Sequence, residues 1–285
     1  MIKVDKLFFT YPGRKEPTLK GMDFTIKKGE IFGFLGPSGA GKSTAQKILI
    51  GMLKNYQGGV RIFDQEVSQV RRSYYERIGV AFEFPNFYQR LTAMENLSLF
   101  RNLYAGDTAE PTQLLTEMGL MESAHMKVTA YSKGMKMRLN LCRALLNHPD
   151  ILFLDEPTSG LDPLNAKKVK DKIICLKEEG KTILITTHNM STADEICDRV
   201  AFIVDGKIEL IDSPRNLRVL HNKRKVRLEY REMDHQLVTS EFDLQGIGTN
   251  HDFLGILQTR NVETIHTQEA TLEDIFINVT GRGLK

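Results

Sequence analysis

The sequence predicts an α/β fold in which helices cover both faces of a parallel β-sheet, with an N-terminal antiparallel β region and a small C-terminal α+β domain. Two observations predict this fold. Short apolar runs at residues 151–154 and 183–185 alternate with helical patterns, which is typical of parallel strands buried on both faces. After Pro214 the composition changes, and shorter, charged, strand-like pieces begin. We therefore expect a large domain over residues 1–220 and a small domain over residues 221–285.

The first half of the chain begins with strands and continues with helices. We expect strands over residues 3–9, 18–26 and 30–35, because the second alternates apolar and polar residues and the third is a short apolar run that ends in a glycine-rich turn. A helix is expected from Lys42 to about Lys54. A strand over residues 78–82 and helices over residues 93–104 and 132–146 follow, and Asn147, His148 and Pro149 end the last helix.

The second half carries the two buried strands, a hairpin and a capped helix. Strands over residues 151–155 and 182–187 flank a helix that begins near Pro163 and stops at Gly180. Residues 199–211 form two alternating runs joined by Asp205 and Gly206, a strong type I′ hairpin signal. In the small domain we expect strands over residues 226–231 and 236–242, and a helix capped by Thr271 with Asp274 at its third position and Gly281 at its end.

Composition and charge exclude several classes of protein. The 39 basic and 36 acidic side chains give a net charge of +3, so no specific nucleic acid is expected as a partner. The basic segment at residues 221–227 is compatible with RNA or lipid headgroups, but a solvated linker accounts for it better. Cys142, Cys175 and Cys197 have no metal-ligand spacing, so we expect buried thiols in a reducing compartment. No apolar run is long enough to span a bilayer.

A glycine-rich motif lies between a predicted buried strand and a predicted helix. Gly36, Gly41, Lys42 and Ser43 satisfy the spacing G-x-x-x-x-G-K-[ST]. Glycines allow the backbone N–H groups to surround a phosphate, and the following helix N-terminus adds positive potential. The motif predicts that Lys42 reaches the β- and γ-phosphates of ATP and that Ser43 offers its hydroxyl to Mg²⁺. A glycine-rich turn without function is the weaker interpretation in this strand and helix context.

Two acidic residues and a histidine follow the buried strands. Asp155 and Glu156 end the strand over residues 151–155, at the edge where ligands collect in open α/β sheets. We expect Asp155 to hold Mg²⁺ and Glu156 to orient or deprotonate the attacking water. His188 ends the strand over residues 182–187, and its imidazole is expected to bond the γ-phosphate. Ordinary strand-end polar residues are the alternative, which the neighbouring phosphate loop disfavours.

These motifs together resemble one family. GPSGAGKST at residues 36–44, YSKGM at 131–135, ILFLDEPTSGLDP at 151–163 and TTH at 186–188 look like the nucleotide-binding subunits of ATP-binding cassette (ABC) transporters. The resemblance covers residues 1–215, and TLEDIFINVTGRGL at 271–284 resembles the tail of the drug-exporter-like (ABC-2 type) branch. It implies a P-loop NTPase cassette with a helical signature subdomain, so residues 1–220 would be the nucleotide-binding domain and residues 221–285 an accessory domain.

The resemblance also implies roles for particular residues. Tyr11 matches the aromatic residue that stacks on adenine, although Phe8 and Phe9 compete for that role. Ser132 and Gly134 match the signature serine and glycine that contact the γ-phosphate held by the opposite subunit, but Lys133 stands where the family has glycine. Glu83 stands at a position that normally carries glutamine and reports the γ-phosphate and Mg²⁺. The implied nucleotide contacts are Tyr11, Gly36, Pro37, Ser38, Gly39, Ala40, Gly41, Lys42, Ser43, Thr44, Glu83, Ser132, Gly134 and Asp162; the implied metal ligands are Ser43, Asp155 and Glu83.

The expected function is therefore an ATPase that powers a membrane exporter. Two copies, or this chain and a second nucleotide-binding subunit, would close on ATP and move transmembrane permease subunits encoded separately, at the cytoplasmic face of the membrane. A small-molecule kinase shares the phosphate loop but gives no reason for a signature motif. A soluble cassette protein of translation or DNA repair usually carries two cassettes or a coiled-coil insertion, and this chain has one cassette and no heptad run.

Overall fold

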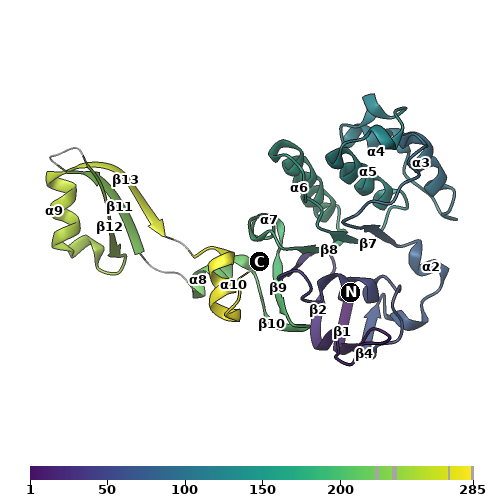
Figure 1. The fold of residues 1–285 in the computed structure, drawn as a ribbon, viewed down its shortest axis with the longest axis horizontal. Coiled ribbons are helices and arrows are strands. Elements are labelled where there is room, and N and C mark those ends of the chain that lie inside the picture. Colours follow the sequence, from purple (N-terminus) through teal and green to yellow (C-terminus); the bar gives the residue numbers. More distant parts are fainter. Residues whose placement is uncertain (222–224, 233–235, 269, 284–285) are drawn as a thin grey trace. The chain divides into compact units, whose positions relative to one another are not determined.

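The structure is a computed structural model that describes residues 1–221, 225–232, 236–268 and 270–283. The chain forms two compact units (Figure 1). Unit 1 consists of Met1–Pro214 and the terminal segment that begins at Arg282, and unit 2 consists of Arg215–Gly281. Unit 2 therefore begins six residues before the expected boundary at residue 221, and the chain returns to unit 1 for its last residues.

A six-stranded sheet forms the centre of unit 1. Its strands lie in the order β10-β9-β3-β8-β7-β6, and all pairs are parallel except β9 and β10. The carboxyl ends of β3, β6, β7 and β8 therefore meet at one edge, which positions the residues that follow them. The bounds are β3 Ile31–Leu35, β6 Ile78–Ala81, β7 Ile151–Asp155, β8 Thr182–Thr187, β9 Arg199–Val204 and β10 Lys207–Asp212.

A second sheet of unit 1 is antiparallel and contains the N-terminus. Its order is β2-β1-β4-β5, with β1 Ile2–Phe9, β2 Leu19–Ile26, β4 Gln57–Ile62 and β5 Gln65–Glu66. The alternating residues of β1 and β2 pack with Phe32, Phe34 and Phe153 of the central sheet, and the three phenylalanines are fully buried. This packing confirms the predicted N-terminal antiparallel region.

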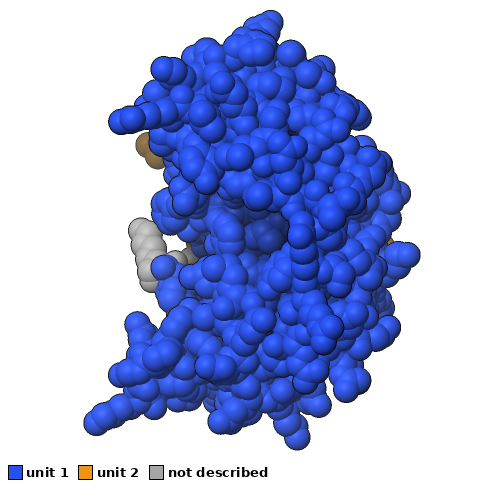
Figure 2. Space-filling model, turned by 90° about the vertical axis from the view of Figure 1, so that its right-hand side faces the viewer, with its two compact units in different colours: residues 1–214, 282–285 blue, residues 215–281 orange. Residues whose placement is uncertain are grey.

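Helices of unit 1 pack against the central sheet and beside one another. α1 and α6 contact β8, α5 contacts β6, and α7 contacts β3. Because side chains on both faces of β3, β7 and β8 are buried, the parallel sheet is covered on both sides, as predicted. The helices are α1 Lys42–Leu49, α2 Arg72–Tyr75, α3 Ala93–Arg101, α4 Pro111–Glu117, α5 Lys133–Leu145, α6 Pro163–Glu178 and α7 Met190–Ile196. Figure 2 shows unit 1 as a packed body that is hollowed near the centre of the face in view.

Unit 2 has a sheet and core of its own. Its antiparallel sheet has the order β12-β11-β13, with β11 Lys225–Arg231, β12 Leu237–Asp243 and β13 Asn261–Gln268. Val226, Leu228 and Tyr230 of β11 pack with Phe253 of α9 His251–Thr259. On β11 the alternate residues are charged, and Arg227 pairs with Glu241 across the strands at 3.3 Å. The unit also contains most of α8 Pro214–Leu220 and all of α10 Leu272–Thr280.

Several expectations about local structure are wrong or incomplete. The first helix ends at Leu49 rather than near Lys54, because Gly51 adopts a left-handed φ of 77° that breaks the helix. Cys142 and Cys197 are buried as expected, but Cys175 is exposed, because it lies on a face of α6 away from buried Val169, Ile173 and Leu176. The elements that had no prediction are β4, β5, β13, α2, α4, α7, α8 and α9. Of the basic segment 221–227, residues 222–224 lie outside the described part of the chain.

Candidate functional site

The phosphate loop joins β3 to α1. Gly36 is required there, since a Cβ atom on it would lie 2.1 Å from the carbonyl oxygen of Ile203. Gly41 precedes α1 with a φ of 109°, a conformation open mainly to glycine. The ammonium of Lys42 donates to the carbonyls of Gly36 at 2.6 Å and Pro37 at 2.9 Å, so this cation is held at the mouth of the loop. Burial lowers the pKa of Lys42, and Glu156 is the strongest of the neighbouring carboxylates that oppose this shift.

Asp155 and Glu156 occupy the end of β7, as the sequence predicts. The Thr186 hydroxyl on the neighbouring strand donates to Asp155, while burial raises the pKa of the Asp155 carboxyl. Glu156 is buried and has a φ of 49°, which is uncommon for a residue with a side chain. This backbone conformation turns Glu156 toward the end of β8, where the Thr187 hydroxyl donates to its carboxylate at 2.9 Å.

His188 binds Glu156 with both its backbone and its ring. The His188 amide donates to Glu156 Oε1 at 2.9 Å, and Nδ1 lies 2.6 Å from the same oxygen. A carboxylate only accepts, so Nδ1 carries the proton and Nε2 is the nitrogen that can meet a substrate. The imidazole is 61% exposed whereas the Glu156 side chain is 9% exposed, so the ring is the accessible member of the pair.

Glu83 follows β6 and faces the same space. Together with Asp155 and Glu156 it forms a group of three carboxylates opposite Lys42. Burial, and then the charges of Asp155 and Glu156, raise the pKa of Glu83. The site therefore concentrates negative charge next to a phosphate loop, an arrangement that favours a cation between the carboxylates and a bound phosphate.

One cavity collects most of the residues predicted for the site. Its volume is about 410 Å³. Tyr11 lies next to this cavity, since its hydroxyl is 3.3 Å from Thr44 Oγ1. Phe9 is buried in the core and Phe8 lies on the opposite face of β1, so of these three aromatic candidates Tyr11 is the one that contacts Thr44. The cavity is lined by Ser38, Gly39, Gly41, Lys42, Ser43, Thr44, Glu83, Asp155, Glu156 and His188.

Ser132, Gly134 and Asp162 do not line this cavity. Ser132 caps α5, where its hydroxyl accepts from the Met135 amide at 3.2 Å, and Gly134 lies in the first turn of that helix. Asp162 caps α6 and accepts from the Asn165 amide at 3.0 Å. A Cβ atom on Gly160 would lie 2.7 Å from Lys133 Nζ, so the Lys133 side chain covers the loop before α6. A Cβ atom on Gly134 would lie 3.2 Å from Leu161, so the first turn of α5 lies beside the loop before α6.

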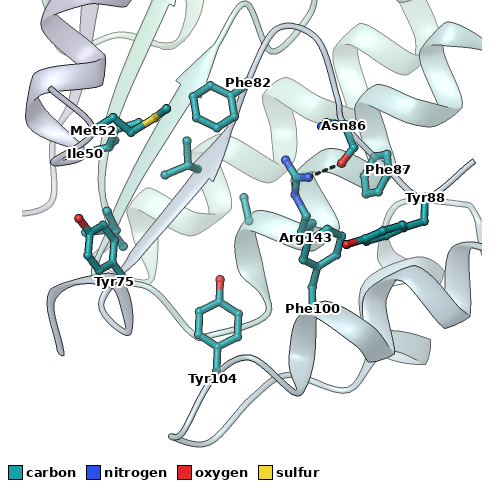
Figure 3. Close-up of a pocket in the computed structure, with 13 residues that line it drawn as sticks. Ile50, Met52, Tyr75, Phe82, Asn86, Phe87, Tyr88, Phe100, Tyr104 and Arg143 are labelled. Atoms are coloured by element: carbon teal, nitrogen blue, oxygen red, sulfur yellow. Dashed lines mark hydrogen bonds between the residues drawn. The ribbon is translucent and has the colours of Figure 1, made fainter. Parts of the chain in front are cut away.

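A second, mostly apolar groove lies between β6, α3 and α5 (Figure 3). Its volume is about 590 Å³, and Phe82, Phe87 and Tyr88 line it. Arg143 crosses the groove, donating to the Asn86 carbonyl at 2.9 Å, with its guanidinium 5.0 Å from the centre of the Phe87 ring. No sequence motif predicts this groove, although the aromatic residues concentrated in residues 82–88 indicate an apolar surface there.

Comparisons with known proteins show the family to which the chain belongs. Residues 19–159 match a family model described as ABC transporter, and residues 224–269 match one described as fluoroquinolone efflux ABC transporter C-terminal domain. A fluoroquinolones export ATP-binding protein of Mycobacterium tuberculosis is 55% identical over 284 residues, which cover 100% of this chain and 94% of the relative. A bacitracin transport ATP-binding protein of Bacillus licheniformis is 32% identical, covering 99% of this chain and 98% of the relative.

Solved structures of ATP-binding cassettes have folds similar to that of this chain. A dimeric ATP-binding cassette in a post-hydrolysis state with ADP and Pi has a TM-score of 0.69 and 29% identity, covering 75% of this chain and 98% of that chain. The site and the fold thus define a P-loop ATPase of the cassette type. The chain belongs to the ATP-binding proteins of ABC transporters, and it binds and hydrolyses ATP as the motor subunit of such a transporter.

Proposed function

We propose that this chain hydrolyses Mg-ATP at the cavity described above and powers drug export through membrane subunits encoded separately. The observation that carries the proposal is the meeting of the phosphate loop, Asp155 and Glu156 at one edge of the central sheet. Phosphoryl transfer mainly requires positioning and charge stabilisation, and these three elements provide both.

We assign the metal to Ser43, Asp155 and Glu83. Hydroxyl and carboxylate oxygens are the ligands that Mg²⁺ prefers, and all three side chains line the cavity. Mg²⁺ usually takes one or two protein carboxylates together with substrate phosphates, and Asp155 and Glu83 would supply these carboxylates. The ion would neutralise charge on the phosphates during transfer.

Glu156 is our candidate for the general base. Its carboxylate is fixed by Thr187 and by His188, so it keeps one orientation toward the space in front of Lys42. A fixed carboxylate can orient a water and accept its proton as the water attacks the γ-phosphate. With Nδ1 bonded to Glu156, the His188 ring presents Nε2 to a phosphate oxygen.

The residues outside the cavity support a dimer. Ser132 caps α5, and the N-terminus of this helix offers free backbone N–H groups that can bind an anion. In a dimer, Ser132 and Gly134 of one copy would contact the γ-phosphate held by the other copy, and Lys133 would add a cation. The dimeric cassette among the similar structures supports this arrangement. Asp162 would hold the loop that connects the two nucleotide sites of the dimer.

The apolar groove is our candidate for the contact with the membrane subunits. Tyr88 and Met52 at the groove are 58% and 60% exposed, and large exposed apolar side chains grouped together mark an interaction site. The apolar face of a helix from a membrane subunit would fill such a groove. Phe82 of the groove directly precedes Glu83 in the sequence, so an occupant would lie next to the segment that reaches the nucleotide cavity.

We further propose fluoroquinolone-type drugs as the exported class. The support is the name of the Mycobacterium tuberculosis relative, whose identity of 55% extends over both units, and the family model matched within unit 2. This part of the proposal concerns the transporter as a whole, because the membrane subunits would contact the drug.

The test uses inside-out membrane vesicles from cells that produce this chain together with its membrane subunits. We expect ATP-dependent uptake of a fluoroquinolone with the wild type and none with Glu156→Gln, which should still bind ATP. Glu179→Gln, at the exposed end of α6, is the matched control and should behave as the wild type. Full uptake with Glu156→Gln would remove Glu156 from the role of base, and ATP hydrolysis without drug uptake would overturn the drug class.

Lys42→Ala should abolish tight ATP binding.

A further inference from the structure

The C-terminal end of the chain returns to the nucleotide-binding unit. The chain leaves unit 1 at Pro214 and enters it again at Arg282. Arg282 and Gly283 line a hollow of about 440 Å³ with residues 37–40 of the phosphate loop and with Asp205. Ser38 and Gly39 line both this hollow and the nucleotide cavity, so the two spaces lie on either side of the same loop tip.

Arg282 forms a two-pronged ion pair with Asp205. Nη1 donates to Oδ1 at 2.8 Å and Nη2 lies 2.8 Å from Oδ2. This parallel geometry is the favoured arrangement between a guanidinium and a carboxylate. Arg282 is 77 residues from Asp205 in the sequence, so the pair fixes the chain end to the β9–β10 hairpin.

Asp205 is itself held against the phosphate loop. It sits in the hairpin turn with a φ of 49°, next to Gly206. The Gly206 amide donates to the Ala40 carbonyl at 3.0 Å, and the Gly206 carbonyl accepts from the Lys20 amide at 2.8 Å. These two backbone bonds determine where the Asp205 carboxylate lies, beside the loop that binds phosphate.

The charge of Asp205 is unfavourable for a nucleotide at this position. A carboxylate near the loop repels a polyphosphate, whereas a carboxylate paired with a guanidinium has little net field. A neighbouring hollow that also reaches Gly39 and Asp205 is lined by Arg14, Lys15, Lys20 and Glu16. The surroundings are therefore basic, and Arg282 is the side chain that pairs directly with Asp205.

We propose that Arg282 is a positioning residue that sets nucleotide affinity by neutralising Asp205 beside the phosphate loop. The C-terminal end of the chain then belongs to the nucleotide site, although it follows unit 2 in the sequence. The proposal goes beyond the function given above and requires only that the cavity binds nucleotide.

The ion pair contributes little to folding, which makes a clean test possible. Its side chains are 54% and 57% exposed, and exposed ion pairs stabilise proteins weakly. Asp205→Asn keeps the turn, because asparagine tolerates a positive φ. Variants at this pair should therefore fold, which thermal unfolding of each variant would verify.

The experiment is a calorimetric titration of Mg-ADP into the full chain, since ADP binds without hydrolysis. Arg282→Ala should raise the Kd about threefold to tenfold, as expected for an unpaired charge near a phosphate group. Asp205→Asn should bind at least as tightly as the wild type, and the double variant Arg282→Ala/Asp205→Asn should return to the wild-type Kd. The difference between Arg282→Ala and wild type should shrink at high salt, because the Debye length falls from about 10 Å at 0.1 M to about 3 Å at 1 M.

Arg77→Ala is the matched control. Arg77 pairs with Asp150 at 2.7 Å with similar exposure, but this pair lies at the amino ends of β6 and β7, the opposite edge of the sheet from the cavity. The Kd of Arg77→Ala for Mg-ADP should equal that of the wild type. An unchanged Kd for Arg282→Ala would overturn the proposal, and so would a double variant as weak as Arg282→Ala. If the wild-type chain did not bind Mg-ADP, the assignment of the cavity as a nucleotide site would itself be wrong.

Discussion

Asp155 is buried at the carboxyl end of β7, and burial raises the pKa of its carboxyl group. The carboxylate that we propose as a metal ligand is thus in an unfavourable charged state in the ligand-free protein. Sites of this kind commonly reduce stability in exchange for function. The same reasoning applies to Glu83, whose pKa burial and the neighbouring acids also raise.

The raised pKa of Asp155 predicts how stability depends on pH. A carboxyl group whose pKa is higher in the folded state binds more protons there than in the unfolded chain. Its favourable contribution is then present below the unfolded value of about 4 and is lost as the pH rises through the folded pKa. We expect Asp155→Asn to remove this loss, because asparagine still accepts from the Thr186 hydroxyl.

Calorimetric melting of the ligand-free protein between about pH 4 and pH 8 measures the effect. The melting temperature of Asp155→Asn should exceed that of the wild type by about 2–4 °C near pH 8, corresponding to roughly 1 kcal/mol, and the difference should shrink toward pH 4. Asp150→Asn, which removes an exposed carboxylate at the other end of β7, is the control and should show no such gain. Parallel melting curves at all pH values would contradict the prediction.

Because the Glu83 carboxylate lines the nucleotide cavity, we predict that it makes ATP binding depend on Mg²⁺. Its carboxylate repels ATP alone but is a favourable oxygen ligand when the cation is present. On a Glu156→Gln background, which we expect to prevent hydrolysis, Glu83→Gln should tighten metal-free ATP binding about threefold to tenfold and change Mg-ATP binding less. Titrations of ATP across Mg²⁺ concentrations measure this difference. Superimposable curves for parent and variant would mean that Glu83 does not contact the metal.

At the scale of elements, the fold class was predictable because its signals are local. The apolar strands β7 and β8 and the phosphate-loop spacing are each contained in short stretches of sequence, and the predicted α/β cassette is confirmed. The end of α1 was predicted too late, because the helical pattern was extended past Gly51, whose left-handed φ of 77° ends the helix. In unit 2, β13 alternates few apolar residues and gave no strand signal.

The site was predictable in part for the same reason. The residues that carry chemistry follow strands whose carboxyl ends share one edge, so Lys42, Glu156 and His188 were expected together. Their roles remain predictions. The bond between Thr187 and Glu156 depends on the register of β7 against β8, and the ion pair of Arg282 with Asp205 joins distant segments, so neither follows from local sequence.

The groove between β6, α3 and α5 yields a prediction about coupling. Tyr88→Ser removes an exposed aromatic ring from the groove, while its backbone stays bonded to Asn96. We expect basal ATP hydrolysis to stay within about twofold of the wild type and drug uptake by permease-containing vesicles to fall about tenfold, as for loss of an aromatic anchor at an interface. Met126→Ser, another exposed apolar residue outside the groove, is the control. Equal losses of hydrolysis and uptake would point to misfolding instead of lost coupling.

At the scale of the whole molecule, each unit contains a cluster of buried hydrophobic residues. Unit 2 buries Leu228 of β11 and Phe253 of α9 in one cluster, and the two sheets of unit 1 share another. A unit with its own core can fold alone. The expected boundary at residue 221 and the observed one at Pro214 both lie near α8, so a chain that ends at Pro214 keeps every strand of both unit 1 sheets.

We therefore predict that residues 1–214 alone fold and bind nucleotide. Their thermal unfolding should be a single cooperative transition, because the central and antiparallel sheets share one core. The truncated chain also lacks Arg282, so its Kd for Mg-ADP should be about threefold to tenfold higher than that of the full chain, and Asp205→Asn in the truncated chain should restore it. Calorimetry measures both quantities on one sample. A gradual, non-cooperative melt would show that unit 2 completes the core of unit 1. A cooperative melt with an unchanged Kd would show that residues 1–214 fold alone and would contradict the role proposed for Arg282.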